Sequence, residues 1–215
     1  KITANKVIAD PEFTKSTPPS VTAATGMDAI THAVESYISN MATPLTEYHS
    51  LKSLQIFHKN LPLAVKDGSD MAAREMMLGC IIVGFGFSNA NLGLVHGIAH
   101  TLSAHFHLAH GMANAAVLPY VMEYNAESCP EKMVELARAI ELSVTGNLEE
   151  DKYLLSRELL RVTKELQIKT LSQQGIEEKD FEMLADDVLK EPVLNFNPRQ
   201  GITKEDMLSI LKKAF

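Results

Sequence analysis

Tryptophan is absent from this 215-residue sequence, and cysteine occurs only twice, as Cys80 and Cys129. Two thiols cannot build the disulfide framework of a small secreted domain, nor the four-cysteine set of a structural zinc site. A chain of this length buries a substantial core without either device. We therefore expect a protein of a reducing, cytoplasmic compartment that folds through apolar packing, with both thiols unpaired and Cys80 filling the core.

Positive charge is also scarce, because 20 lysines and arginines face 27 aspartates and glutamates, for a net charge of −7. Without a basic run, the chain has no surface suited to nucleic acid or to an anionic membrane. Apolar windows such as Cys80 to Phe87 are too short to cross a bilayer, and the N-terminus shows no signal segment. We expect no nucleic-acid partner and no membrane partner.

Several motifs that would provide chemistry are missing. No G-x-G-x-x-G follows a strand, no Walker A sequence occurs, and no G-x-S-x-G elbow is present. Gly84 and Gly86 lie in an apolar, helical context that favours packing. The chain therefore has no phosphate-binding loop and no serine nucleophile of a known type.

The order of elements predicts an all-α helical bundle preceded by a short N-terminal strand and a linker. The strand is expected at Lys6 to Ala9, and Pro18-Pro19 keeps the linker from Asp10 onward out of a helix. Apolar residues then recur at helical spacing. This spacing predicts helices over 22–39, 44–59, 70–87, 92–106, 111–125, 148–166, 178–189 and 204–215.

Three details of these helices are predicted as well. Pro62 opposes continuation of the second helix, and Thr203 is the expected N-cap of the last. The helix from Asp70 to Phe87 is apolar on most sides, which is typical of a helix buried centrally.

Histidine is abundant in one stretch. Five of the eight histidines fall between His96 and His110, within the segment GFGFSNANLGLVHGIAHTLSAHFHLAHGMAN. Histidine is the commonest residue for metal ligation and proton transfer, and packing alone does not require this density. The segment therefore predicts a metal or catalytic site.

Two pairs of residues have the spacing of metal ligands. Asp28 and His32 lie four positions apart on a predicted helix, and His96 and His100 repeat that spacing on another, so each pair shares one helical face. One carboxylate with several imidazoles suits Fe(II), Zn(II), Ni(II) or Mn(II) better than Ca(II) or Mg(II). Spacing predicts Asp28, His32 and His96 as ligands and leaves the fourth open between His100 and His110.

Two long motifs resemble a known family. TAATGMDAITHAVESYIS (22–39) and GFSNANLGLVHGIAHTLSAHFHLAHGMANA (86–115) are similar to the signature pair of the iron-containing (group III) alcohol dehydrogenases. The similarity continues through Asn197-Pro198-Arg199 and so covers essentially the whole chain. In that family an N-terminal α/β domain holds NAD(P), and a helical, dehydroquinate synthase-like C-terminal domain holds the metal in the cleft between them. The resemblance implies that residues 20–215 are the metal-binding catalytic domain, and residues 1–19 a strand and linker from a missing nucleotide-binding domain.

The resemblance also assigns roles to residues. Carried over by motif position, the family's metal ligands fall on Asp28, His32, His96 and His110. His100 would then lie free beside the nicotinamide and substrate, where it contacts the cofactor and assists proton transfer as the catalytic residue. Phe13, in the linker, matches a segment that approaches the cofactor. The chain departs from many relatives at Ala109, where they carry proline, but no ligand is lost.

The activity implied by the resemblance is that of an NAD(P)-dependent oxidoreductase. It would interconvert a small alcohol and an aldehyde or ketone by hydride transfer, with Fe(II), or alternatively Zn(II) or another divalent ion, acting as a Lewis acid on the alcohol oxygen. A zinc-dependent glycerol dehydrogenase-like enzyme and a non-catalytic metal-binding or oligomerising module are the alternatives. We expect a homodimer or larger homo-oligomer, and an isolated chain that is inactive without the nucleotide domain.

Overall fold

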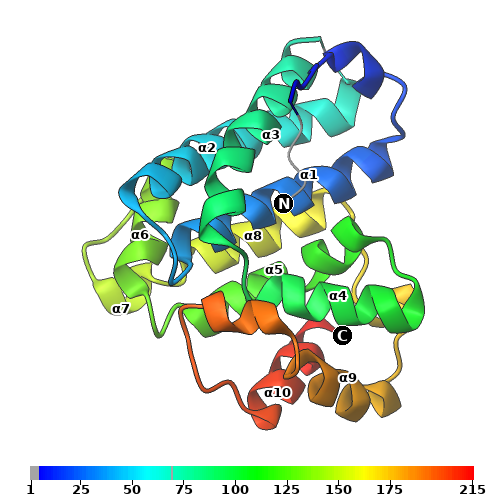
Figure 1. The fold of residues 1–215 in the computed structure, drawn as a ribbon, viewed down its shortest axis with the longest axis vertical. Coiled ribbons are helices and arrows are strands. Elements are labelled where there is room, and N and C mark those ends of the chain that lie inside the picture. The colour runs from blue at the N-terminus through cyan, green and yellow to red at the C-terminus, as the bar shows by residue number, and fades with distance from the viewer. Residues whose placement is uncertain (1–4, 69) are drawn as a thin grey trace.

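The chain folds as a helical bundle (Figure 1). The computed structural model describes residues 5–68 and 70–215, and no strand occurs among them. The all-α prediction is therefore confirmed, whereas the short strand predicted at Lys6 to Ala9 is wrong. That segment is irregular, since a lone extended segment without a neighbouring strand has no ladder to join. Within the predicted linker, Pro11–Thr14 forms a 3-10 helix, η1.

Three long helices make up the upper part of the molecule in Figure 1: α1 (Pro19–Ile38), α2 (Pro44–Asp67) and α3 (Asp70–Ala90). Helix α2 begins at a capping box, in which Thr43 and Thr46 bond each other's backbone. Helix α1 is central, because it packs against α2, α3, α5 and α6. Its position brings the first sequence motif into contact with the rest of the bundle.

The remaining helices lie mostly below α1 in Figure 1 and contain the histidine segment. They are α4 (Leu94–Phe106), α5 (His110–Asn125), α6 (Pro130–Ala139), α7 (Leu148–Asp151), α8 (Leu154–Glu165), the 3-10 helices η2 (Ser172–Gln174) and η3 (Glu178–Asp180), α9 (Phe181–Val188), the 3-10 helix η4 (Pro192–Phe196) and α10 (Lys204–Ala214). The helix predicted over 148–166 is divided between α7 and α8. The predicted cap is confirmed, because Thr203 accepts a bond from the backbone N–H of Asp206.

Helix α2 does not end before Pro62, as the sequence predicted, but continues to Asp67. A proline inside a helix removes one hydrogen bond and costs about 3 kcal/mol. Leu61 is fully buried in the core, and Val65, one turn later, packs against the same core. Packing of this last part of α2 therefore outweighs the local cost of the proline.

Helix α3 is not buried centrally, and that prediction is wrong. Its outer face exposes large apolar side chains, including Met71 at 75% and Phe85 at 60%, and Cys80 is exposed rather than part of the core. The stretch Met71–Ala90 has a mean hydropathy of 1.4 and is long and apolar enough to span a membrane by length and composition alone. The prediction that the apolar windows are too short to cross a bilayer is therefore wrong for this stretch, by length and composition. The inner face of α3 packs on α1 and α2.

Gly111, at the start of α5, allows this helix to approach α1 closely. A Cβ atom there would lie 2.5 Å from the carbonyl oxygen of Ala24, a backbone atom that cannot move aside like a flexible side chain. We expect Gly111→Ala to lower the free energy of unfolding by about 1–3 kcal/mol, measured by urea denaturation. Gly84→Ala is the matched control, because no atom of residues 5–68 and 70–215 lies within 4 Å of the added Cβ. Equal stability of the two variants would contradict the close contact.

Candidate metal centre

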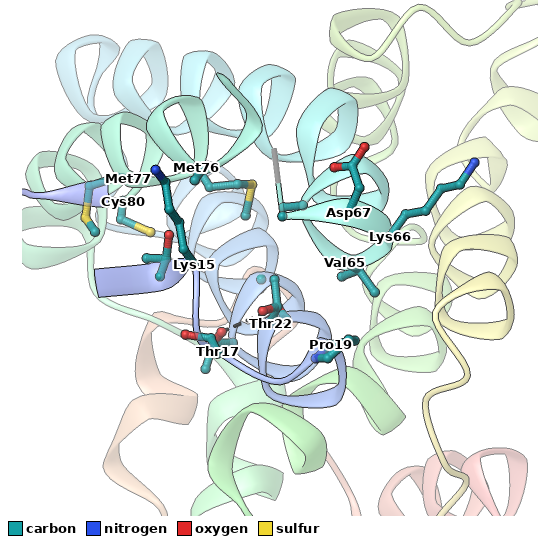
Figure 2. Close-up of a pocket in the computed structure, with 16 residues that line it drawn as sticks. Lys15, Thr17, Pro19, Thr22, Val65, Lys66, Asp67, Met76, Met77 and Cys80 are labelled. Carbon is teal, nitrogen blue, oxygen red and sulfur yellow. Dashed lines mark hydrogen bonds between the residues drawn. The ribbon is translucent and has the colours of Figure 1, made fainter. Parts of the chain in front are cut away.

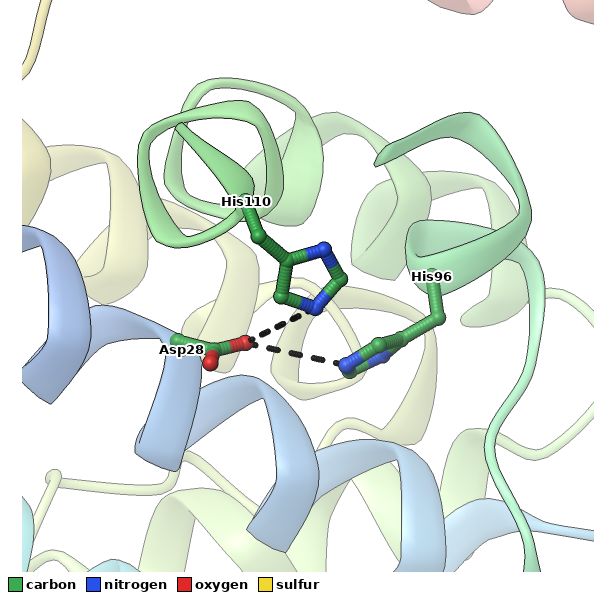
Figure 3. Close-up of side chains that lie close together, drawn as sticks. All are labelled: Asp28, His96 and His110. Carbon is green, nitrogen blue, oxygen red and sulfur yellow. Dashed lines mark ion pairs between the residues drawn. The ribbon is translucent and has the colours of Figure 1, made fainter. Parts of the chain in front are cut away.

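Side chains from three helices converge on one point (Figure 3). Asp28 comes from α1, His96 from α4 and His110 from the first position of α5, and their ligand atoms all lie within 4.8 Å of one another. Nε2 of His96 is 3.6 Å from Oδ1 of Asp28, and Nε2 of His110 is 3.7 Å from the same oxygen. Two atoms that each lie about 2.1 Å from a tetrahedral ion are about 3.4 Å apart. The spacing therefore fits a shared metal ion after a small adjustment.

Asn114 lies one helical turn after His110 and reaches the same point. Its Nδ2 donates to Oδ1 of Asp28 at 2.6 Å and lies 3.0 Å from Nε2 of His110. Its Oδ1 is buried and has no hydrogen-bond partner within the described part of the chain. The NH2 group thus meets several acceptors while the amide oxygen meets no donor. The acceptor atoms of Asp28 and His110 thus surround the partial positive charge of this NH2 group, and a cation fits the same surroundings. One carboxylate together with imidazoles is a ligand set for Fe(II), Zn(II), Ni(II) or Mn(II).

The surroundings set different protonation states for these side chains. Burial lowers the pKa of His96, but the nearby carboxylate of Asp28 and the hydrogen-bonded carboxylate of Glu35 outweigh burial and raise the pKa to about 9. Burial raises the pKa of Asp28, but the interaction with His96 and with the other nearby histidines outweighs burial and lowers the pKa. Burial lowers the pKa of His32 and of His110, which therefore stay neutral at pH 7. Within the group of three, the carboxylate of Asp28 and the neutral imidazole of His110 are in the form that binds a metal, while His96 must first lose a proton.

His32, the fourth ligand implied by the resemblance, lies beside this group but outside it. Its ring centre is 4.6 Å from that of His96, and its Nδ1 lies 3.7 Å from Oδ1 of Asp28. Nδ1 donates to the backbone carbonyl of Asp28 at 2.8 Å, which leaves Nε2 as the nitrogen with a free lone pair. Its role as a ligand remains a prediction.

His100 also lies beside the group. Its ring stacks on that of His110 with centres 5.7 Å apart, and its Nδ1 lies 3.2 Å from Oε2 of Glu191. The group of three close ligand atoms contains His110 and does not contain His100. His100 therefore lies next to the candidate metal position, and its role in proton transfer remains a prediction.

Phe13, the other residue predicted to contact the cofactor, lies on η1, which packs against α3. Its side chain is 82% exposed. This part of the chain thus presents an open aromatic side chain, and a contact with a cofactor remains a prediction.

A cavity of about 360 Å³, with no histidine among its lining residues, lies between η1, the start of α1, the end of α2 and α3 (Figure 2). Thr17, Thr22, Met76 and Cys80 line it, and none of the predicted metal ligands does. Its lining is largely apolar, with several threonine hydroxyl groups. The cavity and the candidate metal centre therefore share no lining residue.

Sequence reasoning missed Glu35 and Asn114, both of which contact the converging residues. The signals were present, because Glu35 lies seven positions after Asp28 and Asn114 four positions after His110, so each shares a helical face with a candidate ligand. Neither residue belongs to a metal-binding pattern that can be recognised without knowing how the helices pack.

Similarity to known proteins agrees with the geometry. Residues 22–215 match the model of the Fe-containing alcohol dehydrogenase family, C-terminal part. The chain is 37% identical over 212 residues to 1,3-propanediol dehydrogenase of Klebsiella pneumoniae, covering 97% of this chain and 54% of that protein. It is 38% identical over 208 residues to lactaldehyde reductase of Escherichia coli strain K12, covering 96% of this chain and 54% of that protein.

Solved structures are similar as well. An alcohol dehydrogenase from Oenococcus oeni superimposes with a TM-score of 0.92 at 33% identity, over 96% of this chain and 54% of that one. The chain thus spans about half the length of the curated relatives it matches. Membership of this family implies the use of a metal and of NAD(P). On the two sequence motifs, the matched fold and the convergence of Asp28 with two histidines, the chain belongs to the iron-containing alcohol dehydrogenase family, whose C-terminal part it matches.

Proposed function

We propose that this chain is the metal-binding helical part of an enzyme that interconverts a small alcohol and an aldehyde or ketone with NAD(P). The observation that carries the proposal is the convergence of Asp28, His96 and His110 within 4.8 Å. Support comes from relatives named as 1,3-propanediol dehydrogenase and lactaldehyde reductase, both oxidoreductases of small alcohols. We propose Fe(II) as the native ion, with Zn(II) as the alternative.

Each residue of the site has a proposed role that follows from its position. Asp28 supplies the negative charge, and His96 and His110 supply nitrogen ligands, with His32 as the proposed fourth ligand. A divalent ion held there would act as a Lewis acid toward the oxygen of the substrate. His100 lies at the edge of the group, where its imidazole can take up or release the hydroxyl proton. Phe87 packs on His32 with ring centres 4.5 Å apart and gives one side of the site an apolar wall.

The nucleotide requires a further protein surface. This chain has no glycine-rich phosphate loop, and its relatives are nearly twice as long. We propose that residues 1–19 act as a linker to a nucleotide-binding domain and that residues 20–215 form the catalytic helical domain. The exposed apolar face of α3 supports the proposal that another protein surface covers it. That surface would belong to the nucleotide-binding domain or to a second copy in the proposed dimer or larger homo-oligomer. The net charge of −7 does not suit a nucleic-acid partner, so we propose small-molecule substrates. We also propose that the enzyme is cytoplasmic.

Metal analysis tests the proposal directly. The chain, purified without oxygen, is expected to hold about one divalent ion. The full-length parent, meaning the proposed longer protein that includes the nucleotide-binding domain, is expected to oxidise short alcohols with NAD or NADP. Absence of divalent metal from both the chain and the active parent would refute the proposal. Metal in the parent without any hydride transfer to NAD(P) would favour the non-catalytic metal-binding module.

His100→Ala separates proton transfer from metal binding. In the full-length parent we expect this change to lower turnover by about 10²- to 10⁴-fold, the usual contribution of an acid-base group, without changing metal content. His105→Ala is the control, because His105 lies on the same helix and pairs with the carboxylate of Asp187 at 2.8 Å. If both variants turn over at the wild-type rate, His100 has no part in proton transfer.

A further inference from the structure

Glu35 is a buried carboxylate that no metal pattern in the sequence includes. Its side chain is 1% exposed, and so is that of His96. Oε2 of Glu35 lies 2.6 Å from Nδ1 of His96, and Oε1 accepts the backbone N–H of Val95 at 2.7 Å. Each carboxylate oxygen of Glu35 therefore accepts a hydrogen bond from one of two consecutive residues of α4, Val95 and His96.

The contact with Nδ1 decides which nitrogen of His96 is free. An ionised carboxylate only accepts hydrogen bonds, so Nδ1 of His96 must carry the proton. In the neutral imidazole this leaves the lone pair on Nε2, and Nε2 is the nitrogen that lies 3.6 Å from Oδ1 of Asp28. A hydrogen bond of this kind fixes both the tautomer and the ring orientation of a metal-binding histidine.

The second contact holds the start of α4. Gly93 is the N-cap residue and has no side chain to bond the first N–H groups of the helix. Oδ1 of Asn197 accepts from the N–H of Leu94 at 3.3 Å, and Glu35 accepts from Val95. A Cβ atom at position 93 would lie 2.9 Å from Oδ1 of Asn197 and 3.2 Å from Oε1 of Glu35. The close approach of these two side chains thus requires glycine at position 93.

Helix α1 carries both carboxylates that face the imidazole of His96. Asp28 and Glu35 are seven residues apart and lie on the same face two turns from each other. Asp28 faces Nε2 of His96 while Glu35 faces Nδ1, so the imidazole is held between two carboxylates from a single rigid helix.

We propose that Glu35 is a positioning residue for the metal site, which fixes the tautomer of His96 and aims its Nε2 at the ion. The proposal rests on the proposed function, because it assigns Glu35 a role toward the metal held by Asp28, His96 and His110. Glu35 is not a ligand in this arrangement, since both its oxygens already accept hydrogen bonds from α4.

Glu35→Gln is the informative variant, because it keeps the size of the side chain. Its amide oxygen can still accept from Val95, but its NH2 group then faces Nδ1 of His96. Nδ1 must become an acceptor, so the proton moves to Nε2 and removes the lone pair that would bind the metal. We expect the affinity of the purified chain for Zn(II), measured by competition with a chelator, to fall about 10- to 100-fold. Nitrogen NMR of the Zn(II)-loaded wild type should show His96 protonated at Nδ1.

Asn197→Ala is the matched control, since it removes the other acceptor at the start of α4 and leaves the contact between Glu35 and His96 in place. It is expected to lower stability to urea without changing the affinity for Zn(II). Equal affinity of wild type and Glu35→Gln, or equal losses in Glu35→Gln and Asn197→Ala, would overturn the positioning role. Failure of wild type itself to bind Zn(II) would instead refute the metal function, and the role of Glu35 with it.

Discussion

Replacing His110 by alanine is expected to remove most bound metal from the chain, whereas replacing His100 by alanine is expected to leave it in place. The two rings stack on each other, yet only His110 belongs to the group of close ligand atoms. Zinc sites of four ligands contribute about 10–16 kcal/mol, so one ligand accounts for about 3 kcal/mol. His110→Ala should therefore weaken Zn(II) binding on the order of 100- to 1,000-fold.

Metal content after dialysis, measured by atomic emission together with chelator competition, checks this result. The two variants are a close pair, because both remove an imidazole from the same edge of the site. The opposite pattern, with metal lost only in His100→Ala, would restore the alternative fourth ligand that residue spacing left open. Retention of metal in both variants would place the site elsewhere.

The stability of the metal-free chain is expected to fall as the pH rises from 6.5 to 9. The pKa of His96 is raised from 6.5 to about 9 in the folded chain, so the folded state keeps a proton that the unfolded state has lost. This stabilisation is fully present below pH 6.5 and disappears as the pH rises through 9. A pKa that rises from 6.5 to about 9 corresponds to about 3 kcal/mol of unfolding free energy.

Below pH 6.5 the trend should reverse. The pKa values of His32 and His110 are lowered from 6.5, so the unfolded state binds more protons there and stability falls with falling pH. Urea denaturation in the presence of a chelator should thus give a maximum near pH 6.5. His96→Gln removes the titrating group and should flatten the decline above this pH. Stability of the wild type that is constant from pH 6.5 to 9 would contradict the raised pKa of His96.

Much of the fold could be read from local patterns. Apolar residues at helical spacing predicted most helices within a few residues, and Thr203 was recognised as a cap because its bond to Asp206 is made within one turn. The sequence misjudged features that depend on distant contacts. Pro62 lies inside α2 because Leu61 is buried, and Lys6 to Ala9 forms no strand because no described segment pairs with it.

Helix α3 illustrates the same limit in burial. Its composition predicted a central helix, but composition does not tell which side of a helix meets a neighbour. The structure packs α3 on α1 and α2 through one face and leaves Met71, Leu78 and Phe85 exposed on the other. We propose that this exposed face of α3 contacts the nucleotide-binding domain or a second copy of the chain.

The sequence by itself determined the helical class, the density of histidine and the pairing of Asp28 with His32 within one helix. Its two motifs also carried the family resemblance, which favoured His110. Only the tertiary structure placed His110 and not His100 in the group with Asp28, because that choice depends on Gly111 letting α5 approach α1. It alone revealed Glu35 and Asn114, whose partners lie 61 and 86 positions away in the chain. Spacing along one helix fixes which residues share a face, whereas contacts between helices are set by how the whole core packs.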